Sequence, residues 1–199
     1  MADNMLECQL ESNSEVLDED QMLVSAARHD TEAAGRLFDK YYSEILGYFY
    51  HCTYDSTISE DLTSNVFLAV FRHLGRYRWR QVPFRAWLYR IATNEVRMHW
   101  RRQKRAKTVS LQPDDNEYIA EPTTAASIEA AEEYRLLHKA LLGLRIKYRT
   151  VIILRYFENK TITEICEITG KKEGTVKAQL HRGRARLQGI LVRWGVLPE

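Results

Sequence analysis

Residues 161–187 read TITEICEITGKKEGTVKAQLHRGRARL, and this stretch predicts two helices joined by a tight turn. Thr161 is a suitable N-cap for the first helix, and Glu164, three residues later, completes a capping box. Isoleucines follow at helical spacing, and Gly170 supplies the left-handed residue that ends a helix. A second helix begins at once. This arrangement is typical of a helix-turn-helix, which places its second helix in the DNA major groove.

The second helix of this motif separates its apolar and cationic residues onto different faces. Its apolar stripe contains Val176, Leu180, Leu187 and Ile190. The cationic residues point largely away from that stripe, so we expect them to face outward, toward nucleic acid. They are Lys177, His181, Arg182, Arg184 and Arg186.

The net charge of +2 hides a strong segregation of charge along the chain. Residues 1–20 contain seven acidic residues and no lysine or arginine, whereas residues 72–107 contain twelve lysines and arginines against one acid. Residues 108–133 are acidic again, and residues 171–193 return to seven basic residues against one acid. Two basic blocks separated by an acidic spacer predict two nucleic-acid contacts on one chain.

Composition excludes several classes of protein. The 199 residues, 45% of them hydrophobic, can bury one ordinary core or two small ones. No apolar run reaches the roughly 20 residues that span a bilayer, and the N-terminus has no secretion pattern, so we expect a cytoplasmic protein without membrane insertion. The cysteines Cys8, Cys52 and Cys166 are widely spaced and lack a ligand-like histidine pattern. We therefore expect no metal and no cofactor, and we interpret His51 beside Cys52 as an ordinary helix residue.

The periodicity is helical throughout, so the expected fold class is all-α: two small helical domains joined by a flexible linker, the second a helix-turn-helix. Besides residues 161–187, helices are predicted over residues 31–53, 84–102, 127–142 and 147–158, with one more that Ser59 caps after a polar turn at 54–58. Proline, aspartate and asparagine gather in the linker. The predicted organisation is an acidic disordered leader (1–19), a first domain (20–103), the linker (104–127), a helix-turn-helix domain (128–192) and a tail (193–199).

Three runs of residues carry a resemblance to a known family. They are 59–78, SEDLTSNVFLAVFRHLGRYR; 84–102, FRAWLYRIATNEVRMHWRR; and 154–187, LRYFENKTITEICEITGKKEGTVKAQLHRGRARL. In content, order and separation they resemble the extracytoplasmic-function (group 4) sigma factors of bacterial RNA polymerase. The resemblance implies a polymerase-binding and promoter-melting domain, then a domain that reads the upstream promoter element. It also implies three partners: core RNA polymerase, promoter DNA and an anti-sigma factor.

By this resemblance, the helix of the first run lays its exposed side on the polymerase clamp. The residues assigned to that contact are Asp61, Leu62, Asn65, Val66 and Phe67. Their spacing alone indicates that Leu62, Val66 and Phe67 belong to the core, so Asp61 and Asn65 are the better interface residues. Family members often have an acidic residue where this chain has Asn65, so the chain lacks that charge.

The second run mixes aromatic residues with arginines, as strand opening requires: cations hold phosphates, and aromatic faces receive unstacked bases. The resemblance assigns a base flipped from the downstream promoter element to the loop 79–83 and the helix after it. Flipping costs a few kcal/mol, which the pocket must return, and no catalytic residue is needed. The loop WRQVP departs from the family loop, so its base preference does not carry over. The assigned residues are Trp79, Phe84, Asn94, Arg97, Arg101 and Arg102.

The third run is assigned to the upstream promoter element. Two departures from the family bear on its stability: Lys172 replaces a serine cap, and Gly183 replaces a frequent alanine, each at a cost on the order of 1 kcal/mol. Glu173 partly compensates for the missing cap at the positive end of the helix. The residues expected near base edges or phosphates are Lys172, Lys177, Ala178, His181, Arg182, Arg184 and Arg186.

Two other classes of protein compete with this interpretation. An autonomous helix-turn-helix repressor or activator explains residues 127–192 but gives the aromatic and basic domain no task. A nuclease would need clustered acidic or histidine ligands for its metal, and the first basic block contains only Glu95. The sequence therefore favours a sigma factor, which is not an enzyme and has no catalytic residues.

The linker and the leader add two expectations. About 25 flexible residues have an r.m.s. reach of only ~25–30 Å. Two promoter elements one and a half DNA turns apart would be separated by roughly 50–55 Å, so the free chain is expected to be too compact to reach both. The leader is interpreted as a solvated tail, with transient cover of a basic block as the alternative.

Overall fold

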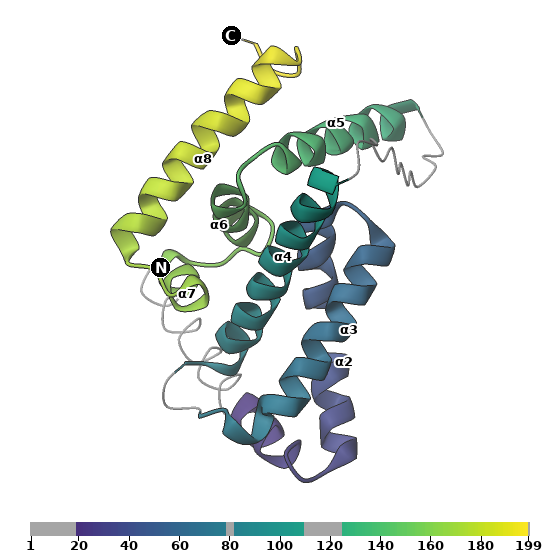
Figure 1. The fold of residues 1–199 in the computed structure, drawn as a ribbon, viewed down its shortest axis with the longest axis vertical. Coiled ribbons are helices and arrows are strands. Elements are labelled where there is room, and N and C mark those ends of the chain that lie inside the picture. The colour runs from purple at the N-terminus through teal and green to yellow at the C-terminus, as the bar shows by residue number, and fades with distance from the viewer. Residues whose placement is uncertain (1–18, 79–81, 110–124, 199) are drawn as a thin grey trace, which may run out of the picture.

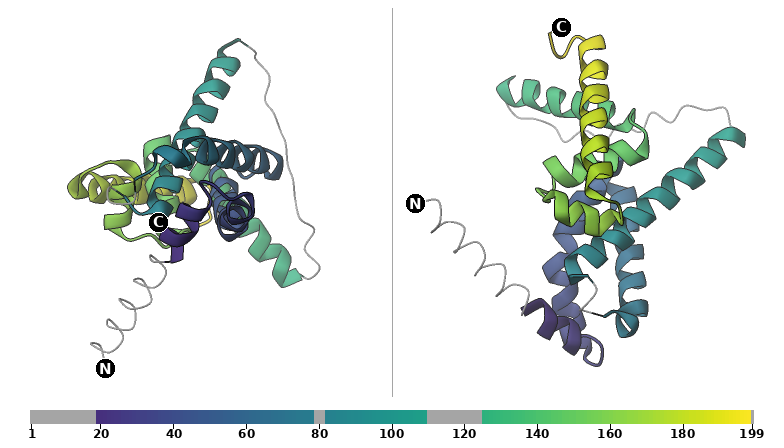
Figure 2. Two further views of the ribbon diagram at one scale, coloured as in Figure 1. Left: turned by 90° about the horizontal axis from the view of Figure 1, so that it is seen from below. Right: turned by 90° about the vertical axis from the view of Figure 1, so that its left-hand side faces the viewer.

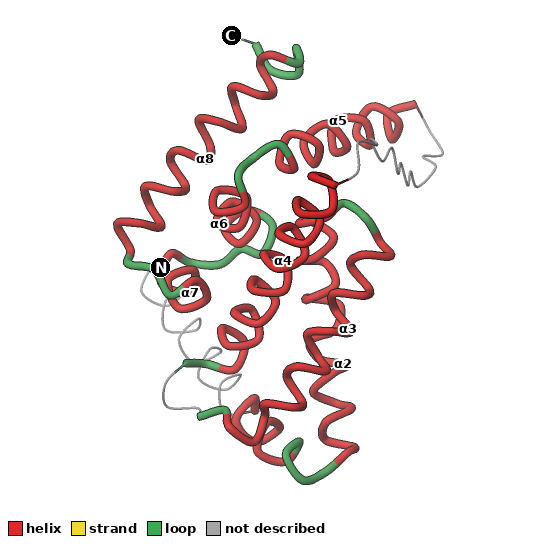
Figure 3. Tube along the Cα trace, in the orientation of Figure 1, coloured by secondary structure: helices red, strands yellow, loops and turns green. Residues whose placement is uncertain are grey.

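The computed structural model describes residues 19–78, 82–109 and 125–198. Every regular element in these ranges is helical, as predicted (Figures 1 and 3). No helix in them is long and apolar enough to cross a membrane. After a helical segment at residues 19–26, the elements are α2 (Thr31–Thr53), α3 (Ser56–His73), a 3₁₀ turn (Leu74–Arg76), α4 (Phe84–Val109), α5 (Ala125–Leu142), α6 (Ile146–Tyr156), α7 (Ile162–Thr169) and α8 (Glu173–Arg193).

The start of α3 differs from the prediction that Ser59 caps this helix. Tyr54 adopts a left-handed conformation with φ 55°, which ends α2 and turns the chain within two residues. Asp55 then caps α3 by accepting a hydrogen bond from the Ile58 amide at 2.9 Å. Ser59 is fully buried one turn inside the helix, where its hydroxyl bonds back to the Asp55 carbonyl. The predicted turn over residues 54–58 is therefore wrong, because the left-handed Tyr54 turns the chain and α3 already begins at Ser56.

Two helices run further into the expected linker than their periodicity indicated. Helix α4 continues to Val109 rather than Arg102, and α5 begins at Ala125 rather than residue 127. Arginine, lysine, glutamine and alanine fill residues 101–106, and all four favour helix on their own, without an apolar stripe. Residues 110–124, the rest of the expected linker, lie outside the described residues.

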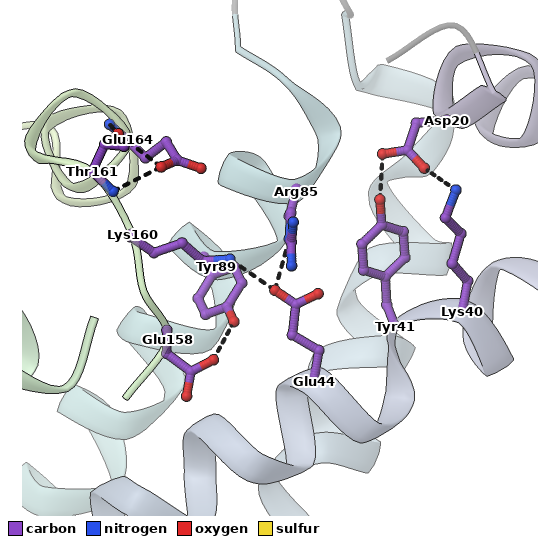
Figure 4. A network of polar contacts seen from close by, with 10 residues as sticks. All are labelled: Asp20, Lys40, Tyr41, Glu44, Arg85, Tyr89, Glu158, Lys160, Thr161 and Glu164. Carbon is purple, nitrogen blue, oxygen red and sulfur yellow. Dashed lines mark hydrogen bonds and ion pairs between the residues drawn. The ribbon is translucent and has the colours of Figure 1, made fainter. Parts of the chain in front are cut away.

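The expected first domain (20–103) begins with an acidic residue that is buried in the fold. Asp20 is 3% exposed, its Oδ1 lies 2.9 Å from Lys40 Nζ, and its Oδ2 accepts a hydrogen bond from the Tyr41 hydroxyl (Figure 4). Both partners lie on α2, so this buried carboxylate ties the segment at 19–26 to that helix. The residues of the expected leader (1–19), apart from Glu19, lie outside the described residues.

The helices form two lobes that pack directly against each other. The N-terminal lobe is defined here as residues 19–109, and the C-terminal lobe as residues 125–198. Figure 1 shows α4 between the α2–α3 pair on one side and α6 and α7 on the other. One continuous hydrophobic cluster includes Leu37 and Val66 of the first lobe and Leu154 and Ile165 of the second. The two lobes therefore share a core in this conformation, although the chain joins them only through residues 110–124.

The helix-turn-helix has the local structure that its residues predicted. Thr161 and Glu164 form both halves of the capping box, and Gly170 ends α7 with φ 67°. Lys172 is the N-cap of α8 in extended geometry but makes no capping hydrogen bond. Helix α8 packs on α5, α6 and α7 at the outer side of the C-terminal lobe (Figure 2).

Gly183 has a packing role that helix propensity alone did not indicate. It is buried at the crossing of α8 and α6, and a methyl group at this position would lie 2.9 Å from Ile152 Cδ1. The close approach of the two helices therefore favours glycine here, even though glycine weakens α8 as an isolated helix.

Candidate nucleic-acid interface

Helix α8 presents a continuous cationic surface. Lys172, Lys177, His181 and the arginines at 182, 184 and 186 are all exposed, and Ala178 is half-buried between them. Two of these cations also have partners within the lobe: Lys177 pairs with Glu173 at 2.5 Å, and the Arg186 guanidinium lies 4.8 Å from the centre of the Tyr148 ring. His181 and Arg182 lie midway along the exposed face, where a side chain can reach base edges in a groove.

A second cationic surface follows α4. Asn94, Arg101 and Arg102 are exposed, and Arg97 is half-buried. Residues 90, 94, 97 and 101 follow the spacing of a helix, so they form one stripe, which is called the α4 stripe below. A positively charged stripe with an amide at its centre suits a phosphate backbone and one base edge.

Phe84, which was also assigned to the downstream element, does not join this stripe. Phe84 is fully buried, with its ring 5.4 Å from that of Tyr41 and 5.7 Å from that of Trp87. It cannot receive a base in this conformation, because an aromatic ring at the start of α4 is needed to fill the core. Trp79 lies outside the described residues. The Tyr77 hydroxyl donates to the Val82 carbonyl at 2.6 Å, which joins the two ends of the chain that flank residues 79–81.

Helix α3 presents a third surface, which is not cationic. Leu62, Val66 and Phe67 are buried, as their spacing indicated, and Asp61 and Asn65 are exposed. The same exposed side carries two apolar residues that the sequence reasoning missed, Leu68 at 62% and Phe71 at 37% exposure. Both residues fall outside the buried stripe of α3, and this spacing could have indicated from the sequence that they are exposed.

A groove of about 610 Å³ adjoins this α3 surface. Phe38, Phe71 and Leu74 form its apolar wall, and Arg28 and Asp39 are among the charged residues at its rim. An exposed apolar side chain beside an open groove is typical of a protein-binding surface rather than of a DNA-binding one.

The described residues contain no cluster of three or more potential metal ligands. His51 hydrogen-bonds to His138 of the other lobe, with 3.2 Å between His51 Nδ1 and His138 Nε2. Burial raises the pKa of Cys52 to about 12, so its thiol is neutral and unsuited to metal binding.

Comparisons with known proteins match both lobes. Residues 37–106 match the family described as Sigma-70 region 2, and residues 134–187 match Sigma-70, region 4. Together the two matched segments cover more than half of the chain. The first contains α3 and most of α4, and the second contains α6, α7 and most of α8.

Individual relatives agree with these matches. The chain is 28% identical to the ECF RNA polymerase sigma factor BldN of Streptomyces coelicolor over 86% of its own length and 65% of BldN. It is 28% identical to the RNA polymerase sigma-H factor of Pseudomonas aeruginosa over 87% of its own length and 94% of that protein. With SigW of Bacillus subtilis the identity is 27%, over 80% and 89% of the two chains.

Solved structures share the fold. CnrH, in complex with the cytosolic domain of CnrY, superposes with a TM-score of 0.65 at 23% identity, over 87% of this chain and 97% of CnrH. RpoE of Bartonella quintana, in complex with the anti-sigma factor NepR, gives a TM-score of 0.63 at 21% identity, over 79% and 95%. Sigma factors are initiation factors and not enzymes. With both sigma-70 regions matched in order, and with these relatives, the chain belongs to the extracytoplasmic-function sigma factors, which direct RNA polymerase to specific promoters.

Proposed function

We propose that the chain is a group 4 sigma factor that acts in the cytoplasm and uses the three surfaces for three tasks. The α3 surface binds core RNA polymerase, the α4 stripe holds the opened downstream element, and α8 reads the upstream element. The observation that carries this proposal is the presence of two cationic surfaces, one on each lobe, beside a third surface that is partly apolar.

The α3 surface has the composition of a protein interface. Leu68 and Phe71 supply exposed apolar area, and Asp61 and Asn65 add polar groups on the same side of the helix. Interfaces commonly combine an apolar centre with a polar rim. Leu62, Val66 and Phe67 support this surface from inside the core and do not contact the polymerase themselves.

The two cationic surfaces divide the recognition of DNA. An arginine on α8 can bind a guanine edge through two hydrogen bonds, which gives sequence specificity. Arg97, Arg101 and Arg102 instead hold phosphates, which gives affinity, and Asn94 supplies the amide that contacts an unstacked base.

Substitutions on the two surfaces should therefore affect different steps. Arg182→Ala should weaken recognition of the upstream element by about 1–3 kcal/mol, the value of one bidentate base contact. Asn94→Ala should leave closed-complex binding nearly intact and impair opening. Permanganate reactivity of unpaired thymines in the holoenzyme complex measures opening, and DNase footprints measure binding. Wild-type opening by Asn94→Ala would exclude the assigned pocket.

The most direct test of the function is reconstitution with core polymerase. We expect the chain to co-purify with core RNA polymerase and to support run-off transcription from specific promoters. Leu68→Asp should reduce co-purification, while Met22→Asp, at another exposed apolar side chain but on the segment at 19–26, should not. Tight, specific footprinting by the isolated chain, together with no binding to polymerase, would favour an autonomous helix-turn-helix regulator instead.

An anti-sigma factor completes the proposed set of partners. The solved structures of CnrH and RpoE are complexes with CnrY and with the anti-sigma factor NepR, respectively. By similarity to these proteins, we expect this chain to be held inactive by such a partner. Co-purification of the chain from its native cells, followed by identification of bound proteins, tests this expectation.

A further inference from the structure

Helix α4 carries a large apolar side chain in the middle of its exposed polar face. Met98 is 41% exposed. Residues three or four positions apart are neighbours on a helix surface, so Met98 lies next to Asn94 on one side and to Arg101 and Arg102 on the other. Single exposed apolar side chains are common on soluble proteins, so exposure alone assigns no task to Met98. Its position between an amide and a group of guanidinium groups is what distinguishes it.

The end of α4 that follows Met98 is suited to double-stranded DNA. Arg101, Arg102 and Arg105 are exposed, and their spacing of three, four and seven residues from Met98 places them on its face of the helix. Figure 2 shows the last turns of α4 extending away from the other helices. Duplex DNA presents its phosphates outward, and arginines bind phosphates without reading sequence. This end of α4 therefore fits the backbone of a duplex.

The end of α4 that precedes Met98 is suited to an unpaired base. Asn94 is exposed, and its amide supplies both a donor and an acceptor, as a base edge requires. Arg90, one further turn toward the N-terminus, is half-buried, and its Nε donates to the Glu167 carbonyl at 2.6 Å. Among the described side chains of α4 from residue 90 onward, the exposed cations therefore all lie after Met98, whereas the exposed asparagine lies before it.

The surface at Met98 itself disfavours a phosphate. Glu95, three residues earlier, is half-buried, and its carboxylate would repel a phosphate placed beside Met98. A methionine side chain donates no hydrogen bond, but it is flexible and makes favourable contacts with aromatic rings. The chemistry at this point of α4 therefore fits the face of a base and not the backbone.

The spacing of these residues along α4 is compatible with the spacing of base pairs. At a rise of ~1.5 Å per residue, Met98 lies ~6 Å from Asn94 along the helix axis, and Arg105 lies ~10 Å beyond Met98. Successive base pairs of DNA are ~3.4 Å apart. For DNA that runs along α4, a base held at Asn94 is therefore about two steps from a base pair at Met98, and the arginines cover about the next three steps.

We propose that Met98 is a wedge residue, which packs against the last base pair of the duplex and prevents it from stacking on the unpaired base held at Asn94. Arg101, Arg102 and Arg105 hold the backbone of that duplex, so the fork between paired and unpaired DNA lies at Met98. Apolar side chains inserted at a base step unstack that step in other DNA-binding proteins. The inference rests on the proposed function, because it takes the downstream promoter element as the DNA on α4.

A series of substitutions at residue 98 tests the wedge. Met98→Leu keeps an apolar side chain of similar volume, Met98→Gln keeps the length but replaces the apolar end by an amide, and Met98→Ala removes most of the side chain. Leucine, glutamine and alanine all favour helix, and the site is partly exposed, so thermal unfolding should be nearly unchanged. Each variant is assembled with core polymerase on a promoter that supports run-off transcription by the wild type.

The rate of strand opening is the main measurement. On the fully paired promoter, Met98→Ala and Met98→Gln should open about tenfold more slowly than the wild type, which corresponds to ~1.4 kcal/mol in the barrier. Met98→Leu should open at the wild-type rate. On the same promoter with a mismatched bubble across the downstream element, all four chains should be equal, because the fork is already open. The base analogue 2-aminopurine at the fork should fluoresce less in the Met98→Ala and Met98→Gln complexes on the paired promoter, because it stays stacked.

Each result decides the inference. Wild-type opening by Met98→Ala would show that no wedge is needed, and an equal defect on paired and mismatched promoters would show that Met98 acts in binding; either result overturns the inference. A defect in Met98→Leu as large as that in Met98→Gln would do the same, because apolar character would then be irrelevant. Met22→Ala, at a side chain 75% exposed on the segment at 19–26, is the control and should behave like the wild type.

Failure of the proposed function has a different signature. It would appear as a wild-type chain that does not assemble with polymerase, or as an Asn94→Ala chain that opens the paired promoter normally. A defect in Asn94→Ala together with normal opening by Met98→Ala would instead reject the wedge alone.

Discussion

At the scale of single residues, His51 and His138 form a pair between the lobes, and the protonation of both histidines depends on the packing of the whole fold. His138 is fully buried, and its Nδ1 lies 3.0 Å from the Tyr134 carbonyl, which can only accept a hydrogen bond. Nδ1 therefore carries the proton, and the neutral Nε2 accepts from His51 Nδ1. Doubly protonated His138 would place two N–H groups against each other, so acid should disfavour this contact.

This pair predicts that acid opens the molecule. Burial and the nearby His138 lower the pKa of His51 to about 4, and burial lowers that of His138. Both histidines titrate near 6.5 in an open chain. Because the packed form binds protons less readily, its stability is complete above about pH 6.5 and falls as the pH drops toward 4.

Small-angle X-ray scattering of the free chain between about pH 6.5 and 4 checks this expectation. The radius of gyration should rise as the pH falls in the wild type and change much less in His138→Gln, whose amide can donate to the Tyr134 carbonyl and still face His51. Two neighbouring titratable groups, Tyr50 on α2 and Tyr134 on α5, have pKa values that burial raises further above this range, so they do not mask the effect. Identical profiles for both chains would contradict the assignment.

At the scale of helices, α8 begins with a defect that can be repaired. Lys172 has the extended backbone of an N-cap, with φ −69° and ψ 149°, but its side chain accepts no hydrogen bond from the first turn. Lys172→Ser should raise the free energy of unfolding by about 1 kcal/mol, because a serine oxygen can accept from the Thr175 amide. Lys172→Ala, which removes the same charge without adding a cap, is the matched control. Thermal unfolding of the two variants distinguishes the gained cap from the lost charge.

The helices also show what could be predicted from local sequence. The bounds of α2 and the capping box of α7 follow from patterns within a few residues, and both were predicted correctly. The start of α3 was missed because Tyr54 adopts a left-handed conformation without glycine or asparagine to indicate it. The end of α4 was missed because residues 103–109 form helix without an apolar stripe.

Local sequence patterns cannot predict contacts between residues that are far apart along the chain. The aromatic and basic character of residues 79–102 indicated nucleic-acid binding, but it could not tell that Phe84 is buried and Asn94 exposed. Lys160 Nζ donates a hydrogen bond to Glu44 Oε1 at 2.9 Å although the two residues lie 116 positions apart, and nothing in the sequence around either residue indicates the other. The sequence predicted a compact free chain from the reach of its linker, whereas the structure shows compactness through a shared core.

At the scale of the whole molecule, that shared core couples the two lobes thermodynamically. Independent domains on a tether would unfold separately, but here α2 packs against α6, and Leu37 belongs to the same hydrophobic cluster as Val151 and Leu154. Side chains in one close-packed cluster lose their contacts together, so we expect the free chain to unfold in a single cooperative transition.

A core substitution in the N-terminal lobe should therefore destabilise the C-terminal lobe as well. Leu37 is fully buried on α2, and Leu37→Ala should cost about 2–5 kcal/mol. Peptide-resolved hydrogen exchange should show lower protection in α6 as well as in α2, while Met22→Ala, at a side chain 75% exposed, should change neither by more than about 0.5 kcal/mol. Loss of protection confined to α2, α3 and α4 would mean that the lobes open at little cost and fold independently.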